Sequence, residues 1–354
     1  VLACVAVAGS ARGARAEFAT IAGWDRQLFP SYIVATATVH RPAEKARTAA
    51  NPNVLGNGSG VLGVRLRSPG DKAGVRLTIS SDLILEPSVF SGTLATEGEE
   101  YRINPNLKFK YAALIQNKQA VPVDVTYRVE IDGQPVEEKT ETIILRSIND
   151  CPRMIVDGKT VTDVRFMFAA YVNEQHPFVD KVLREALDEG IVDSFSGYQS
   201  GEADDVYGQV YALWKALSTR DVRYSSITVT AASSEKVHSQ HVRLIDESIN
   251  NAQANCVDGS VLFASLLRKV GIEPYLILIP GHCYVAFQVD KEGKEIAALE
   301  TTLIGASLEG DAKEVDELSD VVDEDEVEEA SWVTFTACLL YTSPSPRDRQ
   351  KSRM

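Results

Sequence analysis

The chain has 354 residues, of which 44% are hydrophobic and 24% are charged. This balance excludes wholesale disorder, a fibrous repeat and a multi-span membrane protein, and the length allows two or three domains. The formal net charge of -14 would repel a polyanion over most of the surface, so nucleic acid is not an expected partner.

The first residues resemble an export signal. Val1 to Gly9 is almost wholly apolar but far shorter than the ~20 residues of a membrane-spanning helix, and Ala14-Arg15-Ala16 follows as the A-x-A pattern of a signal-peptidase site. Since the first residue is not Met, we expect residues 1–16 to be a truncated signal peptide and the protein to be exported (periplasmic, cell-surface or secreted). A buried N-terminal strand is the alternative. Cys4 matches a lipobox only faintly, because apolar residues continue after it.

Two segments near the C-terminus are not expected to carry function. Residues 308–337 are acidic and predict a linker or an exposed helix, since the Asp-x-Asp-x-Asp-Gly spacing of a calcium loop is missing. From Cys338 onward the sequence turns basic and proline-containing, and it resembles the translation of a transposase-type sequencing adapter. We therefore expect residues 338–354 to be an artefactual tail that replaces the natural C-terminus, with a disordered basic tail as the alternative.

Residues 53–150 contain short β-type runs separated by turn residues, after a lead-in segment at 17–52. Asp132-Gly133 between two such runs is a strong hairpin signal. Alternation from Val123 to Ile131 places the apolar side chains on one face. This pattern predicts a small antiparallel β-sandwich of the immunoglobulin-like type.

The hydrophobic period changes over residues 151–307. Pro177 to Gly190 and Val206 to Leu217 have the spacing of amphipathic helices, and strand-type runs follow from Leu276. Helices and strands segregated in this way predict an α+β domain.

One helix of this domain begins at a cysteine. Asn255 is a good N-cap, Asp258 falls in the first turn, Arg268 and Lys269 fall in the last turn, and Gly271 lies just past the end. Cys256 would then occupy the first helical position, where the helix dipole and the free backbone N–H groups favour a thiolate. The same N–H groups could bind an oxyanion.

Strand-type runs follow this helix. The apolar segment 274–280 predicts a central strand, and the next segment alternates, with His282 on one face. If the following hairpin loop holds three residues, Asp290 pairs with Lys294, and Glu300 becomes the same-face diagonal neighbour of His282. A two-residue loop would place Glu300 on the opposite face.

A thiol, an imidazole and a carboxylate in this order satisfy the requirements of nucleophilic acyl transfer. Cys256 would attack a carbonyl carbon, His282 would hold the thiolate and protonate the leaving amine, and Glu300 would orient the ring.

The three motifs resemble those of the transglutaminase-like superfamily, which has a papain-like α+β fold. The matching segments are Asn-Cys-Val-Asp-Gly at Cys256, Pro-Gly-His-Cys-Tyr at His282 and Ala-Leu-Glu-Thr-Thr at Glu300, and the similarity covers about residues 243–305. Glu300 departs from the usual Asp of the family, and Cys283 displaces the aromatic residue that many members have directly after the histidine. The resemblance implies cleavage or exchange of peptide or isopeptide bonds without a metal or cofactor, on a protein or peptide substrate that includes cell-wall peptide.

Two other functions compete with this hypothesis. The domain could be an inactive surface module that binds protein or glycan, with Cys256 as a small core residue. A zinc-dependent hydrolase could use His238, His241 and Asp246, although no fourth ligand has suitable spacing. Cys283 points away from His282 along the strand, so it is either a core residue or a disulfide partner of Cys151.

Overall fold

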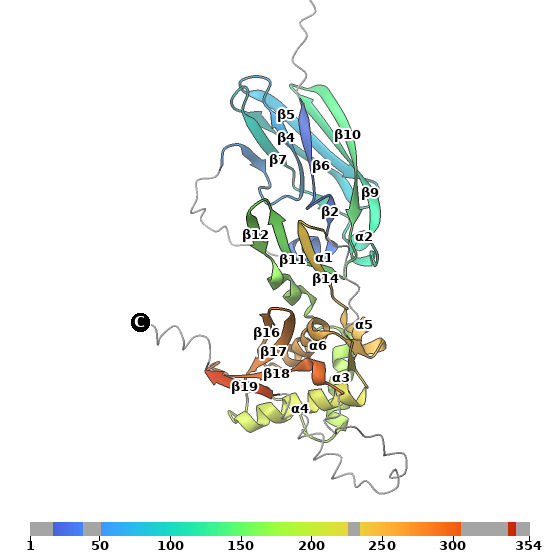
Figure 1. Cartoon of the computed structure of the whole chain (residues 1–354), viewed down its shortest axis with the longest axis vertical. Coiled ribbons are helices and arrows are strands. Elements are labelled where there is room, and N and C mark those ends of the chain that lie inside the picture. The colour runs from blue at the N-terminus through green and yellow to red at the C-terminus, as the bar shows by residue number, and fades with distance from the viewer. Residues whose placement is uncertain (1–16, 38–50, 226–233, 306–338, 345–354) are drawn as a thin grey trace, which may run out of the picture. The chain divides into compact units, whose positions relative to one another are not determined.

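The computed structural model describes residues 17–37, 51–225, 234–305 and 339–344 of a mixed α/β chain in which sheets predominate (Figure 1). The chain forms two compact units, one of Val1–Thr162 with Ser233–His238 and the other of Asp163–Ala232 with Ser239–Met354. The expected signal peptide at 1–16 and the acidic segment at 308–337 lie outside the described residues. Within the described part, no helix has the length and apolarity to cross a membrane.

The first unit is built from two sheets that share one hydrophobic core. One sheet has the strand order β2-β10-β9-β5-β6-β8 and the other β1-β4-β7-β3. Their elements are β1 (Phe18–Ala22), β2 (Gln27–Leu28), α1 (Pro30–Ala37), β3 (Val54–Gly56), β4 (Leu62–Arg67), β5 (Ala73–Ser81), β6 (Leu85–Leu94), β7 (Glu100–Asn104), β8 (Lys108–Phe109), α2 (Tyr111–Gln116), β9 (Val121–Ile131) and β10 (Gln134–Leu145).

The predicted hairpin joins β9 and β10. Asp132 and Gly133 form its two-residue turn with φ of 49° and 76°, the left-handed backbone that such a tight turn requires. The alternation along β9 is confirmed, since Val125, Tyr127 and Val129 are fully buried in the core shared by the two sheets. Most pairs are antiparallel as expected, but β2 pairs with β10 and β3 pairs with β7 in parallel.

The predicted boundaries of this unit are wrong at both ends. Residues 17–52 are not only a lead-in, because β1 pairs with β4 and β2 pairs with β10. These short strands pair with partners distant in sequence, so no local signal marks them. At the other end the unit continues beyond residue 150 into β11 (Asp150–Asp157) and β12 (Thr160–Asp163), which form a sheet in the order β12-β11-β14 with β14 (Val237–His241).

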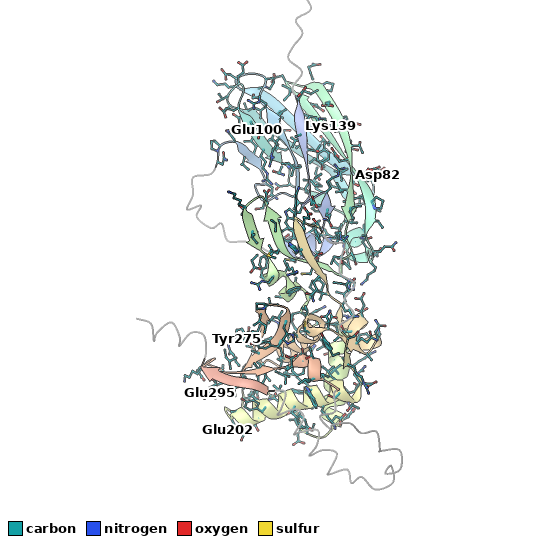
Figure 2. The ribbon with its side chains drawn as sticks, viewed as in Figure 1. Asp82, Glu100, Lys139, Glu202, Tyr275 and Glu295 are labelled. Carbon is teal, nitrogen blue, oxygen red and sulfur yellow. The ribbon has the colours of Figure 1, made fainter. Side chains whose placement is uncertain are left out.

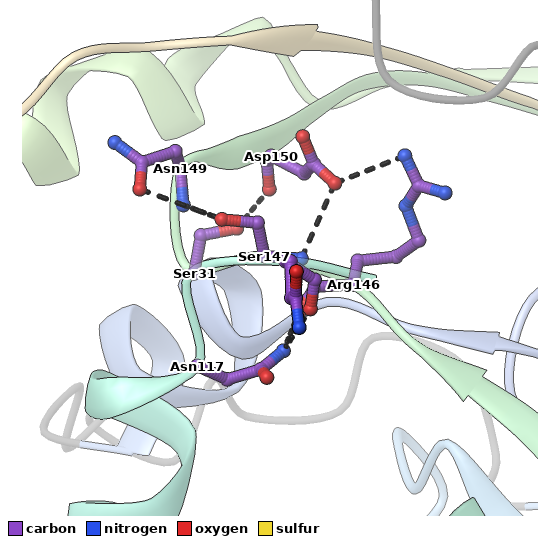
Figure 3. A network of polar contacts seen from close by, with 7 residues as sticks. Ser31, Asn117, Arg146, Ser147, Asn149 and Asp150 are labelled. Carbon is purple, nitrogen blue, oxygen red and sulfur yellow. Dashed lines mark hydrogen bonds and ion pairs between the residues drawn. The ribbon is translucent and has the colours of Figure 1, made fainter. Parts of the chain in front are cut away.

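A buried polar network holds the connection between β10 and β11 (Figure 3). Arg146 Nη2 lies 2.9 Å from Asp150 Oδ2, and both side chains are about 5% exposed. The Ser147 N–H also donates to Asp150 Oδ2, at 3.2 Å. Asn117 Nδ2 donates to the Arg146 carbonyl at 2.7 Å, and Ser31 Oγ donates to the Asp150 carbonyl at 2.6 Å. The buried charges are therefore paired, as burial in a protein interior requires.

The second unit packs helices against a sheet of order β16-β17-β18-β19 (Figure 1). Its main core combines buried side chains of α4, α6, β17 and β18. Its elements are η1 (Arg165–Tyr171), α3 (Pro177–Asp188), α4 (Ala203–Thr219), β13 (Arg223–Tyr224), α5 (Ile245–Asn250), β15 (Gln253–Ala254), α6 (Cys256–Lys269), β16 (Pro274–Ile279), β17 (His282–Gln288), β18 (Glu295–Leu299), η2 (Thr301–Leu303) and β19 (Leu339–Pro344).

The three predicted helices are present as α3, α4 and α6. One expectation for this sheet is wrong. Among the described residues β16 is an edge strand, not a central one, and its residues are half-buried or, at Ile279, exposed although they are apolar. Part of the segment expected to be an artefactual tail, Leu339–Pro344, forms strand β19, antiparallel to β18.

Candidate active site

Helix α6 begins where the sequence predicts. The Asn255 side-chain oxygen accepts hydrogen bonds from the Val257 and Asp258 N–H groups, at 2.9 Å each, and Asp258 Oδ2 accepts one from the Asn255 N–H at 3.0 Å. This reciprocal capping box satisfies two of the free N–H groups of the first turn. Arg243 Nη1 lies 2.7 Å from the same Asp258 carboxylate, whose side chain is fully buried. Cys256 is thereby fixed as the first helical residue.

The Cys256 thiol is half-buried and lies beside the first residues of β17. Burial raises the pKa of the thiol, and the charge of Asp258 raises it further. The backbone N–H groups of Cys283, Val257 and Cys256 itself act to lower this pKa. Desolvation therefore works against the predicted thiolate, and the helix N-terminus works in its favour.

The hairpin register brings His282 and Glu300 together. β17 and β18 pair Val285 with Leu299 and Gln288 with Ile296. Continued to the ends of the strands, this register sets Asp290 opposite Lys294, the three-residue loop that places Glu300 on the face of His282. His282 Nε2 lies 2.6 Å from Glu300 Oε2. The Glu300 carboxylate therefore reaches the ring from the neighbouring strand.

The Glu300 carboxylate is held on its other side by a residue that sequence reasoning missed. Glu300 Oε1 accepts hydrogen bonds from Thr302 N–H at 3.0 Å and Thr302 Oγ1 at 2.7 Å. Glu300 thus caps η2 while Oε2 faces the histidine. A Glu-x-Thr sequence directly after a strand was the available signal, since capping carboxylates accept from the N–H two residues on.

The close approach of η2 to α6 was also missed. A Cβ atom added to Gly259 would lie 3.0 Å from Thr301 Oγ1 and 3.3 Å from Thr301 Cβ. Ser260 Oγ donates to the Cys256 carbonyl at 2.7 Å and lies 3.3 Å from Thr301 Oγ1. Small residues on α6 therefore let the helix that carries the thiol touch the turn that carries the carboxylate.

A catalytic triad requires two contacts, one between the carboxylate and the imidazole and one between the imidazole and the thiol. The structure contains the first of these. The His282–Glu300 pair is formed, but no hydrogen bond joins Cys256 and His282 in the described structure. Because Nε2 faces Glu300, Nδ1 is the ring nitrogen left for a proton exchange with the thiol. The side chain of His282 is 30% exposed, and that of Glu300 is 12% exposed.

The other candidate residues have different surroundings. Cys151 and Cys283 are both free and buried, so the structure supports the core role of Cys283 and not the disulfide. Asp246, a possible zinc ligand, lies 3.9 Å from His176 Nε2. Over the described residues, His238, His241 and Asp246 do not form a metal-binding group, and no set of three or more His, Cys, Asp or Glu side chains does.

Comparison with known proteins adds no family assignment. The sequence matches no protein-family model, and no curated protein is significantly similar to it. Arguments about function therefore depend on the geometry of the site.

Proposed function

We propose that this chain is an exported thiol enzyme that cleaves or exchanges amide bonds with Cys256, His282 and Glu300. The observation that carries the proposal is the 2.6 Å contact between His282 Nε2 and Glu300 Oε2, made from strand β17, which packs against the helix that begins at Cys256. A cysteine that opens a buried helix, followed by this histidine and carboxylate on adjacent strands, also supports a transglutaminase-like, papain-like fold for the second unit. The immunoglobulin-like type remains our proposal for the first unit.

Because burial raises the pKa of the Cys256 thiol, the proton of the thiol must be transferred to another group during the reaction. Cys256 would lose its proton to His282 Nδ1 as its sulfur attacks the carbonyl carbon, and Glu300 would stabilise the imidazolium that forms. The Cys256 N–H, which does not donate to the Asn255 side chain, would donate to the oxyanion. The imidazolium would then protonate the leaving amine, and water or a second amine would attack the thioester. These steps require no metal or cofactor.

The expected substrate is a protein or a peptide, and the peptides of the cell wall are among the candidates. The net charge of -14 supports this choice over nucleic acid. The first unit would recognise or position the polymer. The apolar residues 1–9 and the Ala14-Arg15-Ala16 pattern support export as part of this proposal.

A second candidate function is a non-catalytic module that binds protein or glycan. The observation in its favour is that Cys256 and His282 make no hydrogen bond and that burial raises the pKa of the thiol. Both features fit a cysteine retained for packing.

Iodoacetamide separates the two functions. We expect alkylation of folded protein to modify Cys256 before the buried Cys151 and Cys283, as measured by peptide mass spectrometry. His282→Ala should slow modification of Cys256 by about 10²-fold or more, since general-base help is lost. His238→Ala is the matched control and should leave the rate unchanged.

An activity assay completes the test. Denatured casein is incubated with the protein and a fluorescent primary amine, and peptide release and amine incorporation are both measured. Cys256→Ser should abolish both products. A Cys256 thiol that stays unreactive in folded protein, with neither product formed, would establish the binding module instead.

A further inference from the structure

A cavity of about 580 Å³ lies in the second unit outside the proposed catalytic residues. One wall is β16, which contributes five successive residues from Pro274 to Leu278, including Tyr275 (labelled in Figure 2). The other walls are η1 and α6. Successive side chains of a strand point to opposite faces of its sheet, so a cavity lined by five in a row lies along the edge of the strand.

This edge of β16 has unused backbone groups. Among the described residues, β16 is the last strand of its sheet and pairs with β17 alone. The Gln288 N–H donates to the Glu273 carbonyl at 3.0 Å, which fixes the phase of the antiparallel ladder. Hydrogen-bonded pairs alternate in such a ladder, so Leu276 and Leu278 direct their N–H and C=O groups away from β17. Pro274, which has no N–H, occupies an equivalent position, as proline does on edge strands.

The opposite walls offer apolar surface and positive charge. Phe166 of η1 is 61% exposed although it is large and apolar, and it lines the cavity. Arg165 and Arg268 also line it, against one lining carboxylate, Glu174. Arg268 is paired with Glu174, whereas Arg165 is paired with Asp163 outside the lining. Both arginines are therefore paired, but these pairs are exposed, and exposed ion pairs are weak enough for a peptide carboxylate to compete for a guanidinium.

One end of the cavity lies one strand away from the proposed active site. Leu278, at that end, pairs with Cys283 of β17, the strand that packs against the helix that begins at Cys256. A segment that follows the edge from Pro274 to Leu278 would span four strand steps, about 13 Å. Its end would lie at the part of the sheet where the thiol is.

We infer that the open edge of β16 binds an extended peptide as an added strand. The bound segment makes backbone hydrogen bonds with Leu276 and Leu278, places apolar side chains against Phe166, and presents a carboxylate to the Arg165 and Arg268 side of the groove. This binding does not depend on catalysis. That the bound segment leads to Cys256, as the substrate of that thiol, rests on the proposed function.

The first experiment measures binding alone. The full chain carrying Cys256→Ala is titrated with a pool of fluorescein-labelled hexapeptides composed of Val, Leu, Thr and Glu, and a second pool replaces Glu with Lys. We expect saturable binding of the first pool, detected by fluorescence anisotropy, and weaker binding of the second. No binding of either pool up to about 1 mM, the limit of a weak complex, would overturn the inference.

The second experiment tests whether the added segment is a strand. The tightest member of the first pool, identified by mass spectrometry, is N-methylated one residue at a time. Only alternate residues of an added strand hydrogen-bond to β16, so methylation at every second position should weaken binding about tenfold per lost bond. Equal effects at all positions, or none, would contradict strand addition.

Two adjacent alanines of η1 provide a matched pair of variants. Ala169 lines the cavity and Ala170 does not, and both are exposed, so a large side chain at either position leaves the core intact. Ala169→Trp should weaken peptide binding at least about tenfold by filling the groove, whereas Ala170→Trp should not. Equal binding by the two variants, with unchanged thermal unfolding, would overturn the inference.

The outcomes also separate this inference from the proposed function. Peptide binding that shows the alternate-position signature in a protein with an unreactive Cys256 would retain the groove and reject the enzyme. A reactive Cys256 with no peptide binding would support the enzyme and reject the peptide-binding groove.

Discussion

His282 and Glu300 face each other at 2.6 Å because the hairpin between β17 and β18 fixes a register in which both side chains lie on one face. The carboxylate is held from behind by Thr302, so it can orient the ring without being free to rotate. This pair gives the first prediction.

Glu300→Gln keeps the size of the side chain but removes its charge. The imidazolium of the proposed reaction would lose its stabilisation, so alkylation of Cys256 and turnover should both fall by about 10²-fold or more. Thr302→Val, which removes only one of the two hydrogen bonds from Thr302, should have a smaller effect. An alkylation rate in Glu300→Gln equal to that of the unaltered protein would show that the pair is structural only.

Gly259→Ala should lower the reactivity of Cys256 by disturbing the contact between α6 and η2. The added methyl group would lie 3.0 Å from Thr301 Oγ1, so η2 must move, and Glu300 moves with it. We expect alkylation of Cys256 to slow about tenfold or more, since small displacements of catalytic groups are costly.

Gly208→Ala on α4 is the control for helix propensity. Its added methyl group would meet only Val192 Cγ1, at 3.6 Å. The free energy of unfolding should rise by about 0.5–1 kcal/mol, with unchanged reactivity of Cys256. Identical alkylation rates for both glycine variants would refute the proposed coupling between η2 and the site.

Alkaline pH should destabilise the protein through its buried thiols. Burial raises the pKa of Cys283 from 9.0 to about 12. Below pH 9 the thiol is protonated in both states, whereas above pH 9 the unfolded chain loses the proton and the folded chain keeps it. The contribution of Cys283 to the free energy of unfolding therefore decreases as pH rises, by about 1.4 kcal/mol at pH 10.

Urea unfolding at pH 8 and pH 10 measures this effect. The free energy of unfolding should fall less between the two pH values in Cys283→Ala, because the contribution of that thiol is absent. Burial raises the pKa of Cys151 as well, so part of the loss should remain in this variant. An unchanged loss in Cys283→Ala would mean that Cys283 titrates normally in the folded protein.

Asp150→Ala should destabilise the first unit. The substitution would leave the Arg146 guanidinium buried without its partner, which costs about 3–5 kcal/mol. Glu138→Ala, which breaks an exposed pair with Arg128, should change the free energy of unfolding by less than about 1 kcal/mol. The two variants are compared by urea unfolding, and equal effects would show that the buried network contributes little.

The sequence predicts features whose cause is local. The Asn255 cap, the start of α6 at Cys256 and the turn at Asp132-Gly133 each depend on residues within a few positions, and all three are present. The contact of His282 with Glu300 could also be expected, but only conditionally, because it depends on a loop length that the residues alone leave open. The structure supplies that length.

Features that depend on distant partners could not be predicted. β1 and β2 are too short to be distinguished from a lead-in segment until their partners are known. The apolar residues of β16 suggested burial on both faces, whereas they line a cavity beside an open edge. The raised pKa of Cys256 has the same origin: sequence reveals the helix dipole, but desolvation depends on what packs over the sulfur.

Among the described residues, no hydrogen bond joins the loop Lys291-Glu292-Gly293 to any of the three candidate catalytic side chains. The length of this loop nevertheless determines whether His282 and Glu300 lie on the same face of the sheet. Insertion or deletion of one residue there would turn the Glu300 side chain to the far surface of the sheet while both strands could still form. A duplicate of this gene could thus lose the proposed chemistry through a single-codon change at a distant turn, with every candidate catalytic residue intact. Sequence surveys that score only those three positions would count such a descendant as active.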